Sequence, residues 1–299
     1  MPARYCSWVR KVSGGDIMTY ADVPVGALDY MPWRYADSKL VFRGPRRRLE
    51  GQYALFLGGT ETYGRFIADP FPAIVERRSG LRCVNFGWPN AGVDAFAVDP
   101  DILYAASQAI VNVVQITGAH NVTNPFYSVH PRRNDRFVAA SAALQRLYPE
   151  VDFMEFHFTR HMLGRLWQVS PERYAQVRAA AQNSWVQKMR GVLHEIGSKT
   201  ILLWISERRI SQSLEGGCKG ELASDPVFVT AQMIAMLRPY VARICEVVVS
   251  DDARAQGTEG MVFSASEASA AAAMPGALAH REVAEALVSP VMDMVARRH

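Results

Sequence analysis

The hydrophobic residues of this chain fall into short runs that end abruptly at small or polar residues. The first run, at residues 53–57, stops at Gly58 and Gly59, and the hydroxyl residue Thr60 follows at once. A short apolar run that ends at glycines is typical of a buried parallel strand followed by a tight turn and a helix. Thr60 is therefore expected at the carboxyl end of a strand, where ligands bind in open α/β sheets.

Four further apolar runs repeat this pattern along the chain. They predict strands at residues 82–86, 111–117, 200–205 and 245–249. Helix-like sequence alternates with them, at about residues 70–78, 100–110, 224–243 and 278–295. This alternation predicts a mainly parallel, five-stranded sheet with right-handed crossovers and helices on both faces, that is, a three-layer α/β/α architecture.

The long segment between the third and fourth strands carries the remaining helical pattern. It covers about residues 136–196, and it is interrupted near Pro149 and again before Ser170. We expect one α/β domain over residues 51–299 with this segment as a helical insertion. Residues 1–50 contain many aromatic side chains without a clear period, and they are expected to form an extension that packs on the domain.

Composition narrows the class of protein. Hydrophobic residues make up 49% and charged residues 21% of the 299 positions, which is typical of a folded globular chain, and a net charge of +4 gives no reason to expect nucleic-acid binding. The N-terminal residues lack the apolar core of a signal peptide, and no run reaches the roughly 18 apolar residues of a membrane span. A cytoplasmic protein is expected, with non-classical export left open.

The cysteines give weak support to a cytoplasmic location. All four lie far apart without a CxxC pair, namely Cys6, Cys83, Cys218 and Cys245. Cys83 and Cys245 fall within apolar strand-like runs, where a free, buried thiol is the expected state, and this favours a reducing compartment.

Several glycine-rich turns resemble the sequence blocks of the SGNH (GDSL-type) hydrolases. The run LGGTETYG resembles the first block, with Gly59 where Asp is usual and Thr60 where the nucleophilic Ser is usual. The run VNFGWPNAG resembles the second block, with Gly87 as its glycine. The run TGAHN resembles the third, with His120 in place of Asn and Asn121 in place of Asp.

The C-terminal part of the chain is also similar to that superfamily. The run MPGALAHREVAEAL resembles the stretch that begins at the catalytic His, although Met274 holds that position. His280 lies six residues further on, and no acidic residue precedes Met274 or His280 by three positions. The runs FRGPRR and GGTETYG also resemble those of a bacterial family, a resemblance that supplies no function.

The resemblance to SGNH hydrolases implies a flavodoxin-like sheet and an ester-hydrolysing site. It implies Thr60 as the nucleophile, with the Gly87 amide and the side chain of His120 or Asn121 as donors to the oxyanion. A hydroxyl is a weak nucleophile unless a base lies within hydrogen-bond reach, and His280 is the candidate base. Each residue also has a structural interpretation: a turn-capping hydroxyl for Thr60, a histidine bonded to turn backbone for His120, and a histidine on the helix surface or in its first turn for His280.

Arginine-rich runs suggest an anionic ligand. The run YSVHPRRNDR follows the third strand, and its candidate ligand-binding residues are His130, Arg132, Arg133 and Arg136. Guanidinium groups match the oxygens of carboxylate, sulfate and phosphate. If the run RGPRRR, which contains Arg46, folds over the same edge of the sheet, the pocket is cationic; solvent-exposed loops are the alternative.

No metal or cofactor is expected from the motifs. Glu155, His157 and His161 form an E-x-H-x-x-x-H pattern that would place both imidazoles on one helical face, where they could share a metal ion. However, Phe158 follows His157, so the HExxH signature is absent, and the neighbouring phenylalanines favour packing. The Walker and Rossmann phosphate-binding motifs are also absent.

Three functions fit these observations. The first is a divergent SGNH-like esterase or O-deacetylase that acts on a polar, carbohydrate-linked ester with Thr60 as the nucleophile. The alternative is a catalytically degenerate SGNH-like domain that binds an anionic glycan or a protein partner, motivated by Gly59, Met274 and the missing acid. A transferase with an anionic donor such as a nucleotide is the third.

Overall fold

The computed structural model describes residues 26–212 and 217–296 of the chain. The first half of the predicted extension, including Cys6, lies outside the described residues, and so does the side chain of Cys218. Within the described part, Cys83 and Cys245 are buried free thiols, as the sequence predicts.

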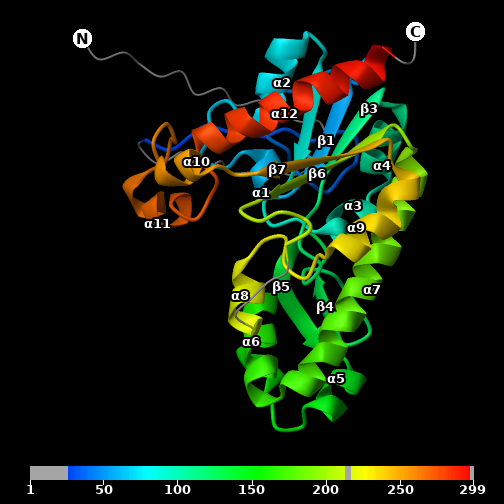
Figure 1. Cartoon of the computed structure of the whole chain (residues 1–299), viewed down its shortest axis with the longest axis vertical. Helices are drawn as coiled ribbons and strands as arrows, with labels where there is room; N and C mark the ends of the chain where they lie inside the picture. The colour runs from blue at the N-terminus through cyan, green and yellow to red at the C-terminus, as the bar shows by residue number, and fades with distance from the viewer. Residues whose placement is uncertain (1–25, 213–216, 297–299) are drawn as a thin grey trace.

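Five parallel strands form the central sheet, as predicted. In chain order they are β1 (Ala54–Gly58), β2 (Cys83–Gly87), β3 (Val111–Gln115), β6 (Thr200–Ser206) and β7 (Arg243–Val248). Their order across the sheet is β2-β1-β3-β6-β7, and every neighbouring pair is parallel (Figure 1). This order makes the domain flavodoxin-like, with a topological switch point between β1 and β3.

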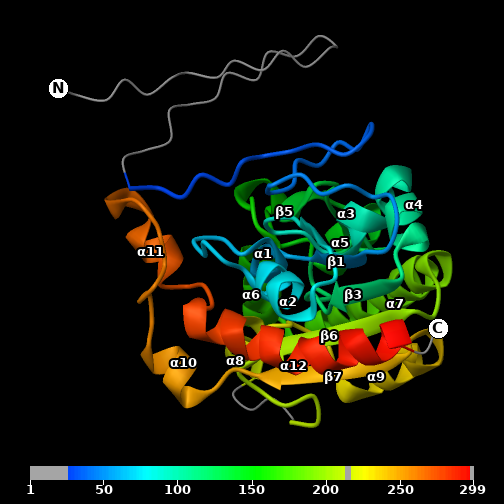
Figure 2. The same ribbon diagram turned by 90° about the horizontal axis from the view of Figure 1, so that it is seen from above.

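Helices cover both faces of the sheet because its strands are apolar on both sides. One face packs against α2 (Phe71–Ser79) and α12 (Ala277–Ala296), with Phe56 and Val113 pointing into that layer. The other face packs against α3 (Val93–Ala97), α4 (Pro100–Gln108), α7 (Pro171–Ile196) and α9 (Ala231–Leu237). Figure 2 shows β1, β3, β6 and β7 of this sheet lying side by side.

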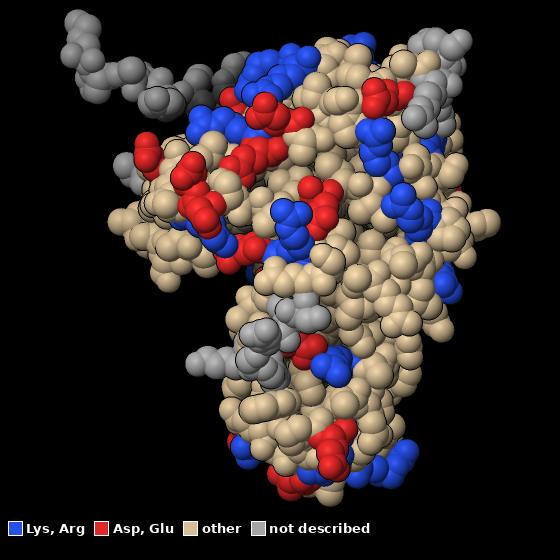
Figure 3. Space-filling model, viewed as in Figure 1, with Lys and Arg blue, Asp and Glu red and all other residues tan. Residues whose placement is uncertain are grey.

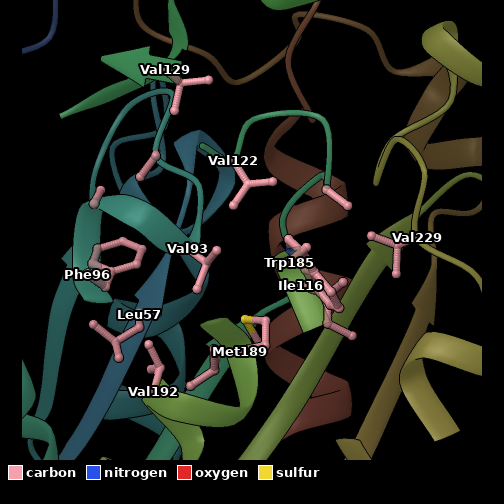
Figure 4. Close-up of a cluster of buried hydrophobic side chains, with 14 of the residues drawn as sticks. Leu57, Val93, Phe96, Ile116, Val122, Val129, Trp185, Met189, Val192 and Val229 are labelled. Carbon is pink, nitrogen blue, oxygen red and sulfur yellow. The ribbon is translucent and has the colours of Figure 1, made fainter. Parts of the chain in front are cut away.

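The larger of the two cores lies between the sheet and α7. Leu57 of β1, Phe96 of α3 and Trp185 of α7 converge there with the other side chains labelled in Figure 4. Helix α7 is 26 residues long, and its apolar positions recur at helical spacing, from Tyr174 to Ile196. It therefore anchors the segments inserted between β3 and β6 to the sheet.

The insertion begins with a hairpin rather than a helix, so the prediction of helical sequence from Arg136 was wrong. Strands β4 (Tyr127–His130) and β5 (Arg133–Ala140) pair antiparallel, and Val129 and Phe137 are buried. Helices α5 (Ala142–Leu147) and α6 (Thr159–Val169) and the 3₁₀ turn η1 (Phe153–Glu155) follow. Together with the lower half of α7, they form a lobe that projects below the sheet (Figure 1).

Short elements complete the chain. The first turn after β1 is α1 (Thr60–Tyr63), and α8 (Gly217–Ala223) lies against α6. The helix predicted from residue 224 starts only at Ala231, capped by Thr230, and ends in η2 (Arg238–Tyr240). Beyond β7 lie α10 (Asp251–Ala255), η3 (Ala265–Glu267) and α11 (Ala268–Ala271).

The described part of the predicted extension, residues 26–50, runs along the side of the domain away from β7 (Figure 2). Phe42 stacks on Phe86 of β2 with ring centroids 4.4 Å apart. Arg43 is buried and donates hydrogen bonds to the carbonyls of Tyr63, Gly64 and Ile67, so it closes the end of α1. None of the helices in the described part of the chain is long and apolar enough to cross a membrane.

Candidate functional site

The switch point of the sheet brings the turns after β1 and β3 together. The chain leaves β1 at Gly59 and β3 at Ile116, and both turns lie at the carboxyl edge, where this fold class binds ligands. Figure 3 shows the outline of the molecule indented between the main body and the lower lobe. We use the term carboxyl-edge cleft for the polar region at this edge of the sheet, around the turns after β1 and β3.

Gln115 joins the two turns through its side-chain amide. Its Oε1 accepts hydrogen bonds from the Gly59 amide (3.0 Å), the Thr62 amide (3.3 Å) and the Thr62 hydroxyl (2.6 Å). A β-carbon at Gly58 would lie 2.5 Å from the same oxygen, so glycine is required there by close approach. With Oε1 facing these donors, Nε2 points to the Glu61 carboxylate, to which it donates at 2.7 Å.

Glu61 lies in the first turn of α1, where the Gln115 side chain holds its carboxyl group at the carboxyl edge. A β-carbon at position 59 would lie 3.3 Å from Glu61 Oε2, so an aspartate in place of Gly59 would crowd the Glu61 carboxyl. Burial raises the pKa of Glu61, and the Gln115 hydrogen bond partly offsets it. The Asp225 carboxylate raises this pKa further, whereas the Arg160 guanidinium lowers it, so these two groups are close enough to Glu61 to influence its charge.

Thr60 lies at the carboxyl edge, as predicted, and its hydroxyl is paired with Asn90. The backbone amide of Asn90 donates to Thr60 Oγ1 at 3.0 Å, and the Thr60 hydroxyl donates weakly to the side-chain oxygen Oδ1 of Asn90 at 3.4 Å. Asn90 adopts a left-handed backbone with φ of 60°, a conformation that asparagine tolerates better than most residues. The observed partners of the Thr60 hydroxyl therefore include no base.

The β4–β5 hairpin packs on the same loop after β2. The side-chain oxygen of Asn134 accepts hydrogen bonds from the backbone amides of Gly92 (2.6 Å) and Ala95 (3.2 Å). The backbone amide of Asn134 donates to the Asn90 carbonyl (3.1 Å). Trp88 Nε1 donates to the Arg132 carbonyl at 2.7 Å. The hairpin thus stands at the carboxyl end of β2.

His120, which follows β3, is fully buried. Its Nε2 accepts a hydrogen bond from Arg160 Nε at 3.3 Å, so the ring proton belongs on Nδ1, which has no partner among the described residues. Burial, reinforced by the Arg160 charge, lowers the pKa of His120 to about 3. Arg160 also holds both carboxylate oxygens of Asp225 at 2.6 Å, which ties α6 to the loop before Pro226.

His280 lies in the opposite helical layer and has no contact with Thr60. It is buried on α12, stacks on Phe71 with centroids 5.7 Å apart, and accepts the Phe71 amide at Nδ1 (3.2 Å). Burial lowers the pKa of its imidazole to about 3. The geometry gives His280 a packing role where α2 begins, in place of the predicted surface or catalytic histidine.

The two remaining candidates for the oxyanion site are also engaged elsewhere. The Gly87 amide donates to Asn85 Oδ1 at 2.8 Å, and a β-carbon at Gly87 would lie 2.1 Å from the backbone nitrogen of Tyr63. Gly87 therefore permits α1 to lie against β2. Asn121 Oδ1 accepts the Thr159 hydroxyl at 2.6 Å, which fixes the start of α6.

The predicted arginine groups lie at opposite edges of the sheet. Arg132 and Arg133 are exposed on the hairpin turn, where both of their amides donate to His130 Nδ1, while Arg136 stacks on Phe158 (4.6 Å). Arg46 instead lines a depression with residues that precede β1 and β2. The condition under which both runs would line one cationic pocket is therefore not met for Arg46.

The E-x-H-x-x-x-H pattern does not form one helical face. His157 lies before α6, whereas His161 lies within it and packs edge-on against Phe156, with centroids 5.0 Å apart. No group of three or more His, Cys, Asp or Glu side chains with metal-binding geometry occurs among the described residues.

Sequence reasoning missed four groups at this edge. They are Glu61, Gln115, Arg160 and Asp225. The signal for two of them was present: Glu61 follows Thr60 directly, and Gln115 is a polar residue at the end of an otherwise apolar strand. Arg160 and Asp225 are brought to His120 only by the tertiary fold.

The fold and the edge geometry define a flavodoxin-like α/β domain with a polar site at its topological switch point. This chain belongs to the family described as domain of unknown function DUF6473, which matches residues 18–295. No curated protein matches it.

Two solved structures show a distant likeness. A lipase, Lip_vut3, from a goat rumen metagenome is 10% identical with a TM-score of 0.41, over 80% of this chain and 96% of that one. A carbohydrate esterase family 2 enzyme with a carbohydrate-binding domain, from Corynascus thermopiles (Myceliophthora fergusii), is 9% identical with a TM-score of 0.41, over 85% and 69% of the two chains. Both scores are low, and the fold assignment rests on the strand order of the chain itself.

The buried histidines predict an acid-sensitive fold. Each has an ordinary pKa of 6.5 and a folded-state pKa of about 3, so the unfolded chain binds more protons between these values and stability falls as pH decreases. Lowering the pH from about 7 to about 5 should cost roughly 2 kcal/mol of unfolding free energy per histidine. The variant His280→Gln keeps an acceptor for the Phe71 amide. In urea unfolding, its loss of unfolding free energy between these two pH values should be smaller than that of the wild type by about 2 kcal/mol.

The matched control is His194→Gln, an exposed position in the last turn of α7, whose pH dependence should equal that of the wild type. If His280→Gln instead loses as much stability on acidification as the wild type does, the imidazole at 280 does not stay neutral in the folded protein.

Proposed function

We propose that the carboxyl-edge cleft binds a polar, carbohydrate-type ligand, and that the chain is an SGNH-like domain without the serine–histidine chemistry of that superfamily. The observation that carries the proposal is the pairing of the Thr60 hydroxyl with Asn90, while both candidate histidines are buried and bonded elsewhere. A nucleophilic hydroxyl needs a base within hydrogen-bond reach, and Asn90 cannot accept a proton in that role.

The groups at the edge support a hydroxyl-rich ligand. Glu61 is partly exposed, and its raised pKa favours a carboxyl that can donate as well as accept hydrogen bonds. Arg160 and Asp225 are partly exposed and act electrostatically on Glu61. Sugar hydroxyls pair with such mixed donors and acceptors, and ligand sites use a few placed polar groups for orientation.

The exposed arginines of the hairpin support a ligand that also carries negative charge. Arg132 and Arg133 follow one another at the turn, and in the described part of the chain no acidic side chain forms an ion pair with either. Their forks match the carboxylate of a uronic acid or a sulfate ester. The hairpin stands beside the Asn90 loop, so one ligand could span both.

Binding is tested by calorimetric titration with trigalacturonic acid. The double variant Arg132→Ala/Arg133→Ala should bind roughly tenfold more weakly, which corresponds to about 1.4 kcal/mol. Arg77→Ala/Arg78→Ala is the matched control, because it removes another adjacent, exposed pair of arginines at the end of α2 and should leave the affinity unchanged. Equal affinities of both double variants, or no binding by the wild type, would refute the anionic-glycan proposal.

A second function, favoured by the raised pKa of Glu61, is hydrolysis of a polar ester. In this alternative an esterase or O-deacetylase would use Glu61, instead of a histidine, to take the proton from Thr60 or from water. Carboxyl groups with raised pKa values are typical of acid–base sites. Where the proton comes from Thr60, the alternative keeps the attacking group that the resemblance to SGNH hydrolases implies.

Release of p-nitrophenol from p-nitrophenyl acetate separates the two functions. The binding proposal predicts that the wild type, Thr60→Ala and Glu61→Gln all give the uncatalysed rate after chelation of stray metals. A wild-type rate above that background that falls about 10²-fold or more in either variant would establish the hydrolase instead.

A further inference from the structure

We propose a second binding site, for a dianionic phosphate group, in a depression at the amino edge of the sheet. The depression has a volume of about 470 Å³, and Arg46, Arg48, Glu50 and Arg82 line it. This inference is independent of the function proposed for the carboxyl-edge cleft. We call the depression the amino-edge pocket.

Its place in the fold separates it from the cleft. Arg82 directly precedes β2 (Cys83–Gly87), and Glu50 lies four residues before β1 (Ala54–Gly58). Because β1 and β2 are parallel, both residues mark the amino ends of the strands. The Thr60 and Glu61 side chains lie beyond the opposite ends, so the two sites do not share a ligand.

Two of its arginines are held in place before any ligand binds. Arg82 Nη1 donates to the carbonyls of Arg48 (3.2 Å) and Glu50 (2.7 Å), which fixes the loop against the start of β2. The Arg46 guanidinium lies 4.4 Å from the ring centroid of Trp33. Binding to groups that are already ordered loses less conformational entropy.

Trp33 itself is anchored. Its backbone amide and carbonyl pair with Phe42 at 2.7 Å in both directions, and Phe42 stacks on Phe86 of the sheet. The aromatic support of Arg46 is therefore continuous with the hydrophobic core.

The charge balance of the pocket favours an anion. Three guanidinium groups and one carboxylate line it, whereas the neighbouring Arg47 is already paired with Glu76 at 2.5 Å. Within the described ranges, no ion pair involves Arg46, Arg48 or Arg82. Clustered cations of one sign in a depression concentrate anions there.

The geometry of guanidinium narrows the class of anion. Its planar fork matches two oxygens of one phosphate group, and several forks can share the oxygens of a dianion. The volume lies within the usual range of small-molecule sites. A free phosphate and a phosphomonoester offer the same terminal group, so the shared chemistry is the dianionic phosphate.

The proposal is tested by calorimetric titration of the full chain with inorganic phosphate and, in parallel, with glucose 1-phosphate. Saturable binding of either probe is expected, and tighter binding of the ester would identify a phosphomonoester as the ligand class. Arg46→Gln/Arg48→Gln should weaken binding about tenfold or more, because both side chains are exposed and their loss removes two forks without opening the core.

Arg146→Gln/Arg165→Gln is the control, since it removes the same charge from two exposed positions on α5 and α6, away from both proposed sites, and should change the affinity by less than about twofold. Circular dichroism of both double variants verifies that they fold. The proposal is overturned if neither probe binds saturably to the wild type, or if both double variants lose the same affinity, which would indicate a general effect of net charge.

Discussion

The carboxyl edge depends on one buried amide, the side chain of Gln115. Its oxygen accepts three hydrogen bonds from Gly59 and Thr62, and its nitrogen donates to Glu61. Without this side-chain amide, the donors at the start of α1 would be buried and unpaired, which would lower the unfolding free energy by about 1–3 kcal/mol for each group. The same contact fixes where the Glu61 carboxyl lies, so the turn geometry and the chemistry of the edge have a common cause.

The histidines show how burial changes the chemistry expected from sequence motifs. A histidine near a strand end or near the C-terminus fits a general base, but His120 and His280 are both enclosed and neutral, and each is bonded to a group outside the Thr60 environment. The Glu61 carboxyl, in contrast, is a titratable group at this edge that remains partly exposed. The charges thereby divide the surface: a mixed polar cleft at one edge and a cationic pocket at the other.

Much of the fold could be predicted from the sequence, because apolar runs that end at glycine leave few structures other than buried parallel strands. The hairpin was missed because the second strand lacks an apolar–polar alternation: the polar residues 133–136 are followed by the continuous apolar run 137–140. The position of Thr60 was predictable from the strand it follows, but its partner Asn90 was not, because thirty residues separate them. The location of Arg46 depended on the path of the extension, which local pattern does not determine.

The most direct test of the cleft as the binding site is the NMR signal of the Gln115 side-chain amide during titration with trigalacturonic acid. Its Nε2 group donates a hydrogen bond to the Glu61 carboxylate, so its proton signals report on any ligand that contacts Glu61. The account predicts a saturable shift of this signal, together with those of the Gly59 and Thr62 amides. Saturable shifts confined to residues away from the carboxyl edge, with the Gln115 signal unchanged, would contradict it.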